Sequence, residues 1–429
     1  MPGAVSFREA LFFWLKLGFI SFGGPAGQIA IMHRELVDEK KWIEESRFLH
    51  ALNFCVLLPG PEAQKLATYA GWLLHGTRGG LAAGILFVLP GALVMLALSI
   101  LYALGRGIPA VEGALFGIKA AVLVIVLEAL IRIGKRALKT RFLIGVAVAA
   151  FIGIFFFALP FPLIVLAAAV AGFCTTRARP AAAAPEAPPG RWRQAAIALT
   201  SGVLLWWTPV LLAVLILGAR HVLVDVGLFF SKLAVVSFGG AYALLAYMAQ
   251  QAVENYGWMS APEMVDGLGL AETTPGPLIL VTQFVGFLAA YRDAAPFSAL
   301  GAGVLGAAMT TWVTFVPPML LIFAGAPFVE QLRANQRLSG ALAAVTAAVV
   351  GVILNLTVWF ALHVLFGEVE EMRVGWLRWY AFDALALDLK VGALALIAAG
   401  LAFALHRGLV EVVLIMAAIG VALRLMLPV

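Results

Sequence analysis

Long apolar stretches follow one another along almost the whole chain, and short polar segments separate them. A helix that crosses a lipid bilayer needs about 20 predominantly apolar residues. The first half of the chain contains stretches of this kind near residues 8–32, 47–75, 80–104, 111–131, 142–157 and 161–173. The pattern therefore predicts an all-α polytopic membrane protein.

The composition agrees with this prediction. Hydrophobic residues make up 63% of the 429 residues and charged residues 12%, and a soluble core of this size could not keep so much apolar surface away from water. We therefore expect the lipid bilayer to be the main environment, with little room for a soluble domain. The net charge of +6 comes from basic loop clusters, as at residues 132–141, rather than from a basic face with interleaved aromatic residues. A nucleic-acid partner is not expected.

The sequence carries no signal of metal, redox or cofactor chemistry. Cys55 and Cys174 are too few and too far apart for a disulfide framework or a metal site, and the six histidines lack a ligand spacing such as H-x-x-x-H. A membrane enzyme such as an oxidoreductase would need a cofactor site, and the chain has no Cys-x-x-Cys-His haem motif and no nucleotide-binding loop. We therefore predict neither a cofactor nor an enzyme.

The second half of the chain repeats the first at an offset of 216 residues, as from Ser21 to Ser237. Three features recur without a gap: Lys16 as Lys232, Ser21-Phe-Gly-Gly as Ser237-Phe-Gly-Gly, and Pro59-Gly-Pro as Pro275-Gly-Pro. The two halves are therefore expected to be copies of one fold. The repetition also argues against a cleaved signal peptide at the N-terminus, because the same signal-like segment occurs again deep in the chain.

A segment rich in alanine and proline separates the halves, and arginines flank it. We expect it to be a flexible linker, and the positive-inside rule places it in the cytoplasm together with the basic loop 132–141. Counting back along the spans gives a cytoplasmic N-terminus. The predicted organisation is a first repeat (1–175), the linker (176–194), an extra transmembrane helix (195–218) and a second repeat (219–429).

The extra helix has no counterpart before the first repeat, so the second repeat would begin on the opposite side of the membrane. The repeats are therefore expected to be inverted, with about 13 spans in all. The second-half counterpart of the basic loop carries Glu368, Glu370 and Glu371, which suits an external position. Inverted repeats with a binding site between them are a recurrent architecture of secondary transporters. Whether the segments around Pro59 and Pro275 cross the membrane or re-enter is left open.

Each half contains a Pro-Gly-Pro sequence inside an otherwise apolar helical stretch, at Pro59-Gly60-Pro61 and at Pro275-Gly276-Pro277. Proline lacks a backbone donor and clashes with the preceding turn, so each sequence must break a helix and free backbone groups. Pro61 and Pro277 suit the first position of a new half-helix, whose positive dipole end would face the membrane interior. Such a terminus binds anions, although the break could also be a kink that neighbouring helices accommodate.

The Ser-Phe-Gly-Gly motifs add backbone amides to this predicted site. The candidate residues are Ser21, Gly23 and Gly24 in the first half and Ser237, Gly239 and Gly240 in the second. Glycine pairs allow backbone conformations in which successive amides point at a ligand. They equally allow close packing between helices, and the glycines alone do not decide between the two interpretations.

Lys16 and Lys232 lie about two helical turns into apolar spans, at equivalent positions of the repeat. A lysine at the centre of a span costs on the order of 2.5 to 3.5 kcal/mol, and a cost repeated in both halves suggests a use. An ammonium group in a low dielectric attracts an anion more strongly than one in water. The alternatives are snorkelling to the interface or pairing with a buried carboxylate.

Carboxylates lie next to both breaks. Glu62 follows Pro61, and Glu272 precedes Pro275 by three residues, so either could carry a coupling proton, whereas Glu62 could equally complement a helix dipole. Gln64 and Thr274 are close enough in sequence to contribute donors to a bound anion.

Taken together, these motifs closely resemble the two-domain branch of the chromate ion transporter family. The resemblance is carried by Ser21-Phe-Gly-Gly-Pro-Ala-Gly27, Leu57-Leu-Pro-Gly-Pro-Glu-Ala-Gln64, Leu66-Ala-Thr-Tyr69 with Gly71-Trp72, and Glu272-Thr-Thr-Pro-Gly-Pro277. It implies a multi-pass protein of the bacterial cytoplasmic (inner) membrane that exports chromate and so confers chromate resistance. The resemblance also implies that sulfate competes as an analogue and that the proton motive force drives transport.

The resulting hypothesis is a transporter in which a dianion binds between the half-helix N-termini, with Lys16 and Lys232, and the two repeats rock to expose it alternately. A channel is the nearest alternative, and another oxyanion such as sulfate could be the substrate. Transport direction, stoichiometry and oligomeric state, for which a homodimer is one option, are not determined by the sequence.

Overall fold

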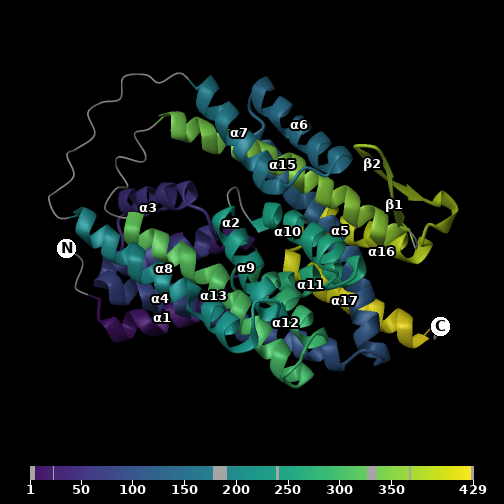
Figure 1. The fold of residues 1–429 in the computed structure, drawn as a ribbon, viewed down its shortest axis with the longest axis horizontal. Coiled ribbons are helices and arrows are strands. Elements are labelled where there is room, and N and C mark those ends of the chain that lie inside the picture. The colour runs from purple at the N-terminus through teal and green to yellow at the C-terminus, as the bar shows by residue number, and fades with distance from the viewer. Residues whose placement is uncertain are drawn as a thin grey trace. The chain divides into compact units, whose positions relative to one another are not determined.

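The computed structural model describes residues 5–22, 24–176, 191–237, 241–325, 336–366 and 369–426. These residues form helices, apart from one small β-hairpin (Figure 1). It divides into two compact units, each built from segments of both halves of the chain. Unit 1 comprises residues 1–99, 177–241 and 274–339, and unit 2 comprises residues 100–176, 242–273 and 340–429.

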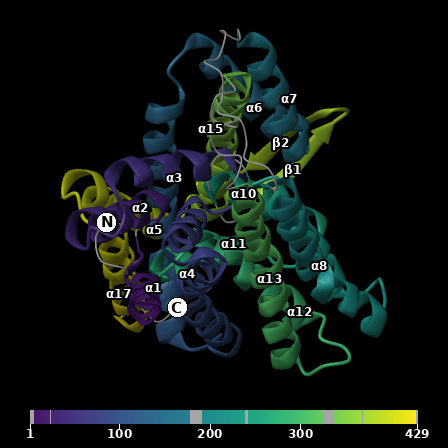
Figure 2. The same cartoon turned by 90° about the vertical axis from the view of Figure 1, so that its left-hand side faces the viewer.

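Unit 1 contains the broken helices. Its elements are α1 (Phe7–Ile20), α2 (Gly24–His33), the π-helix η1 (Arg34–Glu39), α3 (Glu45–Leu57), most of α4 (Glu62–Leu104), α8 (Arg191–Leu217), α9 (Val222–Val235), the 3₁₀-helix η3 (Leu278–Leu280), α12 (Val281–Arg292) and α13 (Ala299–Gly325). Within this unit α12 and α13 pack side by side (Figure 2).

Unit 2 holds long apolar helices and the hairpin. Its elements are α5 (Pro109–Ala137), α6 (Arg141–Phe157), α7 (Phe161–Thr175), most of α10 (Ala241–Ala249), the π-helix η2 (Gln250–Asn255), α11 (Ala261–Thr273), most of α15 (Gln336–Leu365), β1 (Val369–Val374), β2 (Leu377–Phe382), η5 (Ala384–Ala386), α16 (Leu389–Ala399), the π-helix η6 (Gly400–Ala404) and α17 (Leu409–Met426).

The order of elements recurs at the offset seen in the sequence. Helix α3 (Glu45–Leu57) and helix α11 (Ala261–Thr273) have the same length and lie 216 residues apart, as do the π-helices η1 (Arg34–Glu39) and η2 (Gln250–Asn255). A π-helix is uncommon and usually occurs as a short insertion in an α-helix. Its recurrence at the equivalent place shows that the similarity of the halves extends to local backbone structure.

The first predicted span, near residues 8–32, is not one continuous helix. Helix α1 ends at Ile20, Ser21 and Phe22 are non-helical, and α2 begins at Gly24. The first half-helix is therefore separated from the second at the Ser-Phe-Gly-Gly motif, because this segment leaves helical backbone geometry before Gly24, which has a φ of 70°.

Helix α4 reverses direction at His75 and Gly76, where φ is −138° and +61°. The segments before and after this point pack closely, since a side chain at Gly71 would lie 2.4 Å from the carbonyl oxygen of Gly79. Glycine at both positions permits this close helix–helix approach. Residues 62–104 thus form a tight helical hairpin.

Glycines also set the packing of α5 against α17 in unit 2. A Cβ atom at Gly117 would lie 1.8 Å from the carbonyl oxygen of Met416, and one at Gly420 would lie 2.1 Å from the carbonyl oxygen of Gly113. Small residues that let two backbones meet are typical of helix contacts in membranes.

The hairpin β1–β2 is the one departure from the all-α prediction among the described residues. The strands pair antiparallel from Val369 with Phe382 to Val374 with Leu377, and Gly375 takes a φ of +60° in the two-residue turn. Glycine suits such a turn, and β-branched and aromatic residues favour the extended strands beside it. The sequence pattern predicts a loop for this segment, because the segment is too short and too charged to form a transmembrane helix.

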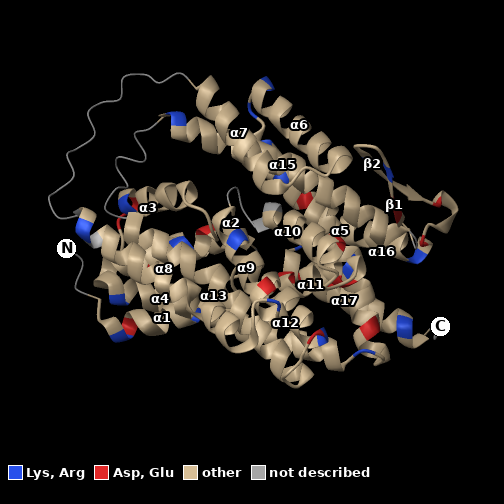
Figure 3. Ribbon diagram, viewed as in Figure 1, with Lys and Arg blue, Asp and Glu red and all other residues tan. Residues whose placement is uncertain are grey.

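In the described part of the chain, six helices are long and apolar enough to cross a membrane: α4, α5, residues 195–217 of α8, α13, α15 and α17. Most of the ribbon of these helices is tan in Figure 3, which colours Lys and Arg blue and Asp and Glu red. Shorter apolar helices lie at Arg141–Phe157, Phe161–Thr175, Leu278–Arg292 and Leu389–Ala404. The protein is therefore a helical, multi-pass membrane protein.

Candidate substrate-binding site

Both Pro-Gly-Pro sequences break a helix, as predicted. Helix α3 ends at Leu57 and α4 begins at Glu62, whereas α11 ends at Thr273 and η3 begins at Leu278. The glycines between the prolines have φ values of +103° at Gly60 and +91° at Gly276. These values lie in the region that favours glycine. The glycine of each motif is therefore what allows the chain to turn between the two half-helices.

Each break is hydrogen-bonded to the Ser-Phe-Gly-Gly motif of the other half, within unit 1. The amide of Gly60 donates to the carbonyl oxygen of Ser237 at 2.9 Å, and the amide of Gly276 donates to the carbonyl oxygen of Ser21 at 2.7 Å. Two pairs of equivalent residues, far apart in the sequence, thus form reciprocal contacts. We call these four residues and their hydrogen bonds the crossed-break cluster.

A helix from the opposite half also packs on each break. A Cβ atom at Gly60 would lie 2.4 Å from Cγ of Pro318 in α13, and one at Gly91 in α4 would lie 2.1 Å from the carbonyl oxygen of Pro275. Pro90 and Pro317 are the equivalent residues of the two covering helices, because the second half has an insertion of 11 residues that changes the repeat offset from 216 to 227 in this part of the chain. The breaks are therefore enclosed by protein, which is the condition under which non-helical backbone is tolerated at membrane depth.

The side-chain amides of three glutamines donate hydrogen bonds to backbone carbonyl groups of unit 1. Nε2 of Gln28 donates to the carbonyl oxygen of Gly276 at 2.5 Å, Nε2 of Gln64 donates to that of Phe315 at 3.0 Å, and Nε2 of Gln283 donates to that of Ala92 at 2.9 Å. All three glutamines are buried.

Several buried polar atoms of unit 1 keep hydrogen-bonding capacity. Among the described residues no hydrogen bond is made by the hydroxyl groups of Ser21, Thr282 and Thr314, nor by Oε1 of Gln64 and Gln283. Buried polar groups are nearly always hydrogen-bonded in folded proteins. Hydroxyl groups can donate to an anion, so this region has the chemistry to bind a polar ligand.

Lys65 is a buried cation beside the first break that the sequence interpretation missed. Its side chain is 1% exposed, and Nζ donates a hydrogen bond to the carbonyl oxygen of Leu58. A buried ammonium group needs charge or hydrogen-bond partners. The sequence does contain a signal for it, since Lys65, like Lys16, is a cation in an apolar helical stretch. Unlike Lys16, however, Lys65 has no lysine counterpart in the second half.

Lys16 and Lys232 lie elsewhere. The side chain of Lys16 is 57% exposed, and its Nζ is 3.0 Å from Oε1 of the buried Glu35. Lys232 is also exposed, on α9. Neither is part of the buried cluster, and for Lys16 the structure shows the pairing with a buried carboxylate that was the alternative interpretation.

The other predicted residues fall into three groups. Glu62 is the first residue of α4, and Thr274 is buried within the second break. Glu272 belongs to unit 2, where it is buried and accepts a hydrogen bond from the hydroxyl of Tyr242 at 2.8 Å. Gly23, Gly239 and Gly240 lie outside the described residues.

A family model described as "Chromate transporter" matches residues 8–173 and 224–423, and therefore most of both halves. The chain belongs to the chromate transporter family. The resemblance inferred from the sequence motifs is thus confirmed.

Members of the chromate transporter family from several organisms are similar over most of the chain. It is 32% identical to the chromate transport protein of Pseudomonas aeruginosa, over 100% of this chain and 94% of that protein. It is 28% identical to the probable chromate transport protein of Synechococcus elongatus, over 83% and 84% of the two chains. It is 26% identical to the chromate transport protein of Cupriavidus metallidurans, over 82% of each. No solved structure matches the chain.

Proposed function

We propose that this protein is a secondary transporter that exports chromate from the cell, with the proton motive force as its energy source. It acts in the bacterial cytoplasmic membrane, has its N-terminus in the cytoplasm and confers chromate resistance. Sulfate, which has the same tetrahedral dianionic form, is the expected competitor. Membership in the chromate transporter family and the names of the similar proteins support chromate as the substrate.

The crossed-break cluster is the observation that carries the proposal. It joins two half-helix N-termini, those of α4 and η3, to motifs of the opposite halves within one compact unit. Half-helices that end in the middle of the membrane are a recurrent feature of transporter binding sites. A contact in which each half supplies an equivalent residue supports a site shared by both repeats.

The chemistry of the cluster favours an anion. Helix N-termini present amide hydrogens and a partial positive charge, and the ammonium group of Lys65 adds a full one close to the first break. In our proposal the dianion contacts amides of the first turns of α4 and η3, which follow the two breaks. Hydroxyl and amide donors from Ser21, Gln64 and Thr274 complete its coordination.

The transport cycle we propose is rocking of the two inverted repeats, which exposes the site alternately to the two sides of the membrane. A ligand held with equal affinity in both states would not be pumped, so proton binding has to favour one of them. Lys16 and Lys232 are proposed to assist the anion as it enters or leaves, because both side chains are exposed. Glu62 and Glu272 are the candidate proton carriers next to the breaks.

The test is uptake of labelled chromate into inverted membrane vesicles, with and without a protonophore. Proton-driven export predicts concentrative uptake that the protonophore abolishes. Uptake that follows only the chromate gradient would contradict the proposed coupling and favour a channel. Unchanged uptake by the double variant Lys16→Ala and Lys232→Ala would remove these lysines from the mechanism.

Competition in purified proteoliposomes identifies the substrate. Chromate uptake is measured with increasing sulfate, molybdate or phosphate, and chromate export predicts inhibition by sulfate with a lower affinity than that of chromate. A higher affinity for sulfate, together with sulfate-driven exchange, would make sulfate the substrate instead.

A further inference from the structure

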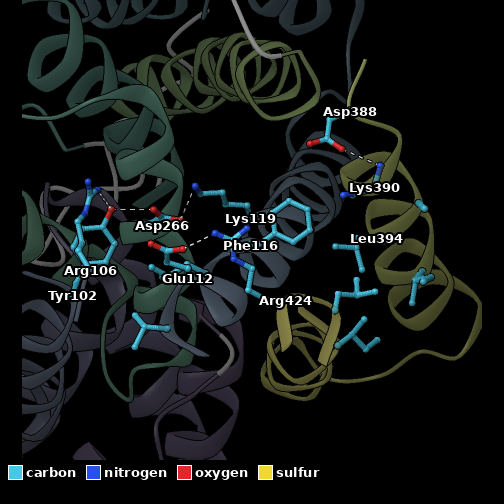
Figure 4. Close-up of a pocket in the computed structure, with 16 residues that line it drawn as sticks. Tyr102, Arg106, Glu112, Phe116, Lys119, Asp266, Asp388, Lys390, Leu394 and Arg424 are labelled. Atoms are coloured by element: carbon cyan, nitrogen blue, oxygen red, sulfur yellow. Dashed lines mark hydrogen bonds and ion pairs between the residues drawn. The ribbon is translucent and has the colours of Figure 1, made fainter. Parts of the chain in front are cut away.

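Unit 2 contains a cavity of about 730 Å³ that takes no part in the crossed-break cluster. Its walls are mainly apolar and come from α5, α16 and α17 (Figure 4). One end of the cavity carries a group of polar side chains: Tyr102, Arg106, Lys119 and Asp266. Asp266 is the most deeply buried of the charged residues that line the cavity.

Asp266 is the centre of this group. Its side chain is 5% exposed, and Oδ2 accepts a hydrogen bond from the hydroxyl of Tyr102 at 3.0 Å. Its other oxygen, Oδ1, lies 3.5 Å from Nζ of Lys119 and makes no hydrogen bond among the described residues. A buried carboxylate oxygen with unused hydrogen-bonding capacity is a natural position for a proton.

Lys119, on α5, holds the counter-charge, and its side chain is 28% exposed. It lies ten residues after Pro109, the first residue of α5, which corresponds to about 15 Å along the helix axis, or about half the thickness of a bilayer core. A charged pair at this depth is expensive, and in membrane proteins such pairs mark ion and proton pathways. Lys119 and Asp266 therefore call for a functional explanation.

A polar connection links Asp266 to the end of the helices. The hydroxyl of Tyr102 accepts a hydrogen bond from Arg106 at 2.8 Å, and Arg106 also pairs with the buried Glu263. Arg106 lies in the turn between α4 and α5, and its side chain is 57% exposed. A line of hydrogen bonds thus runs from an exposed guanidinium group to the buried carboxylate.

We propose that Asp266, in addition to the candidate carriers Glu62 and Glu272 next to the breaks, binds a proton that couples transport to the proton motive force, with Lys119 as its counter-ion. This inference rests on the proposed function. The carboxylate takes up one proton from a hydronium ion that reaches the cavity: one O–H bond of the hydronium breaks, one O–H bond to the carboxylate forms, and a water molecule is released. The ion pair with Lys119 is lost. Lys119 is then left with an uncompensated positive charge, so the local charge rises by one unit.

The position of Asp266 in the chain connects this change to the second break. Helix α11 carries Asp266 and ends at Thr273, one residue before the segment Thr274–Pro277. A shift of α11 when its ion pair opens is therefore passed directly to that segment. The repeat-equivalent residues of the pair are His50 and Thr346, so this carboxylate–ammonium pair is not duplicated and gives the two halves different roles.

Other ionisable groups near the pair could also contribute to a pH dependence of transport. The titratable and charged groups that face the pair or line the cavity are Tyr102 on α4, Arg106 in the following turn, Glu112 on α5, Glu263 on α11, Asp388 and Lys390 at the start of α16, and Arg424 on α17. Glu112 is paired with Arg424 at 2.8 Å and its side chain is 42% exposed. It is therefore a suitable control carboxylate from the same cavity.

The experiment compares two activities of the full-length protein in proteoliposomes. Asp266→Asn removes the ionisable group and keeps the shape of the side chain. We expect pH-gradient-driven accumulation of chromate to fall at least tenfold, while chromate–chromate exchange, which needs no net proton movement, stays within about threefold of wild type. Glu112→Gln is expected to retain both activities.

Lys119→Met provides a second measurement. Loss of the ammonium group favours the protonated carboxyl group, so the midpoint of uptake against pH should move upward by about one pH unit or more. Accumulation that persists in Asp266→Asn, loss of exchange together with accumulation, or an unchanged pH midpoint in Lys119→Met would each overturn the inference. Failure of the wild type to exchange chromate would instead overturn the proposed substrate.

Discussion

The ammonium group of Lys65 donates a hydrogen bond to the carbonyl oxygen of Leu58, across the first Pro-Gly-Pro break. The lysine thus satisfies a carbonyl group at the end of α3 and at the same time places a positive charge beside the N-terminus of α4. Both effects stabilise the break, and the charge also makes it attractive to an anion.

Replacing Lys65 by methionine should therefore impair chromate transport. A hydrogen bond to a charged group contributes about 1.5 to 3 kcal/mol, so the uptake rate at low chromate concentration is expected to fall about tenfold or more. The exposed Lys40, replaced by alanine, is the control. Wild-type uptake by Lys65→Met, at equal amounts of protein in the vesicle membrane, would exclude Lys65 from the site.

Gly60→Ala tests whether the geometry of the first break matters. The substitution combines a positive φ with a Cβ atom 2.4 Å from the ring of Pro318, so we expect transport to be lost and the melting temperature in detergent to fall. Gly218 is a matched control because it also has a positive φ, 89°, but a Cβ atom added there would have no atom within 4 Å. Gly218→Ala should show only the backbone cost of about 1 to 2 kcal/mol. Equal effects of the two variants would contradict the enclosed break.

The contact between α5 and α17 predicts that two glycine-to-alanine variants differ strongly in thermal stability. Gly117→Ala would place a methyl group 1.8 Å from the carbonyl oxygen of Met416 and should lower the thermal midpoint by several degrees, because the two helices must separate. Gly145 in α6 has no atom within 4 Å of an added Cβ, so Gly145→Ala should stabilise its helix by up to about 1 kcal/mol. The measurement is thermal unfolding in the same detergent, and a stable Gly117→Ala protein would refute the close packing.

Arg378 is expected to fix the β-hairpin to unit 2. Its guanidinium group, 3% exposed, donates to Glu254 at 3.2 Å and to the carbonyl oxygens of Ile154 and Phe155. Removing one partner of a buried pair costs about 3 to 5 kcal/mol, so Arg378→Ala should strongly reduce stability or increase proteolysis of the hairpin. Arg373→Ala removes a pair with Glu371 in which the arginine is 63% exposed, and it should cost about 1 kcal/mol or less. Similar protease sensitivity of the two variants would count against this anchor.

The sequence allowed much of the local structure to be predicted. The Pro-Gly-Pro sequences end helices for a purely local reason, and the offset of 216 residues is matched by the bounds of α3 and α11. The family was identified correctly because its motifs are local and ordered. The inversion of the repeats, the number of spans and the roles of the individual site residues stay predictions.

Contacts between distant segments could not be predicted in the same way. The partner of Lys16 depends on how η1 folds back towards α1, and the pairing of Lys119 with Asp266 depends on how α5 packs against α11. Lys65 was missed because the repeat drew attention to duplicated lysines, whereas the buried one occurs once. A charged residue within an apolar helical stretch is therefore a candidate site residue even where the other half of the chain has no equivalent charge.

The reciprocal bonding of Gly60 and Gly276 has a consequence for chain architecture. A polypeptide with only one half would present a glycine amide without its acceptor and a serine carbonyl without its donor, both in a dry environment. Such a half-length chain could complete its own fold only by associating with a second copy, so covalent fusion of the halves turns a bimolecular assembly step into an intramolecular one.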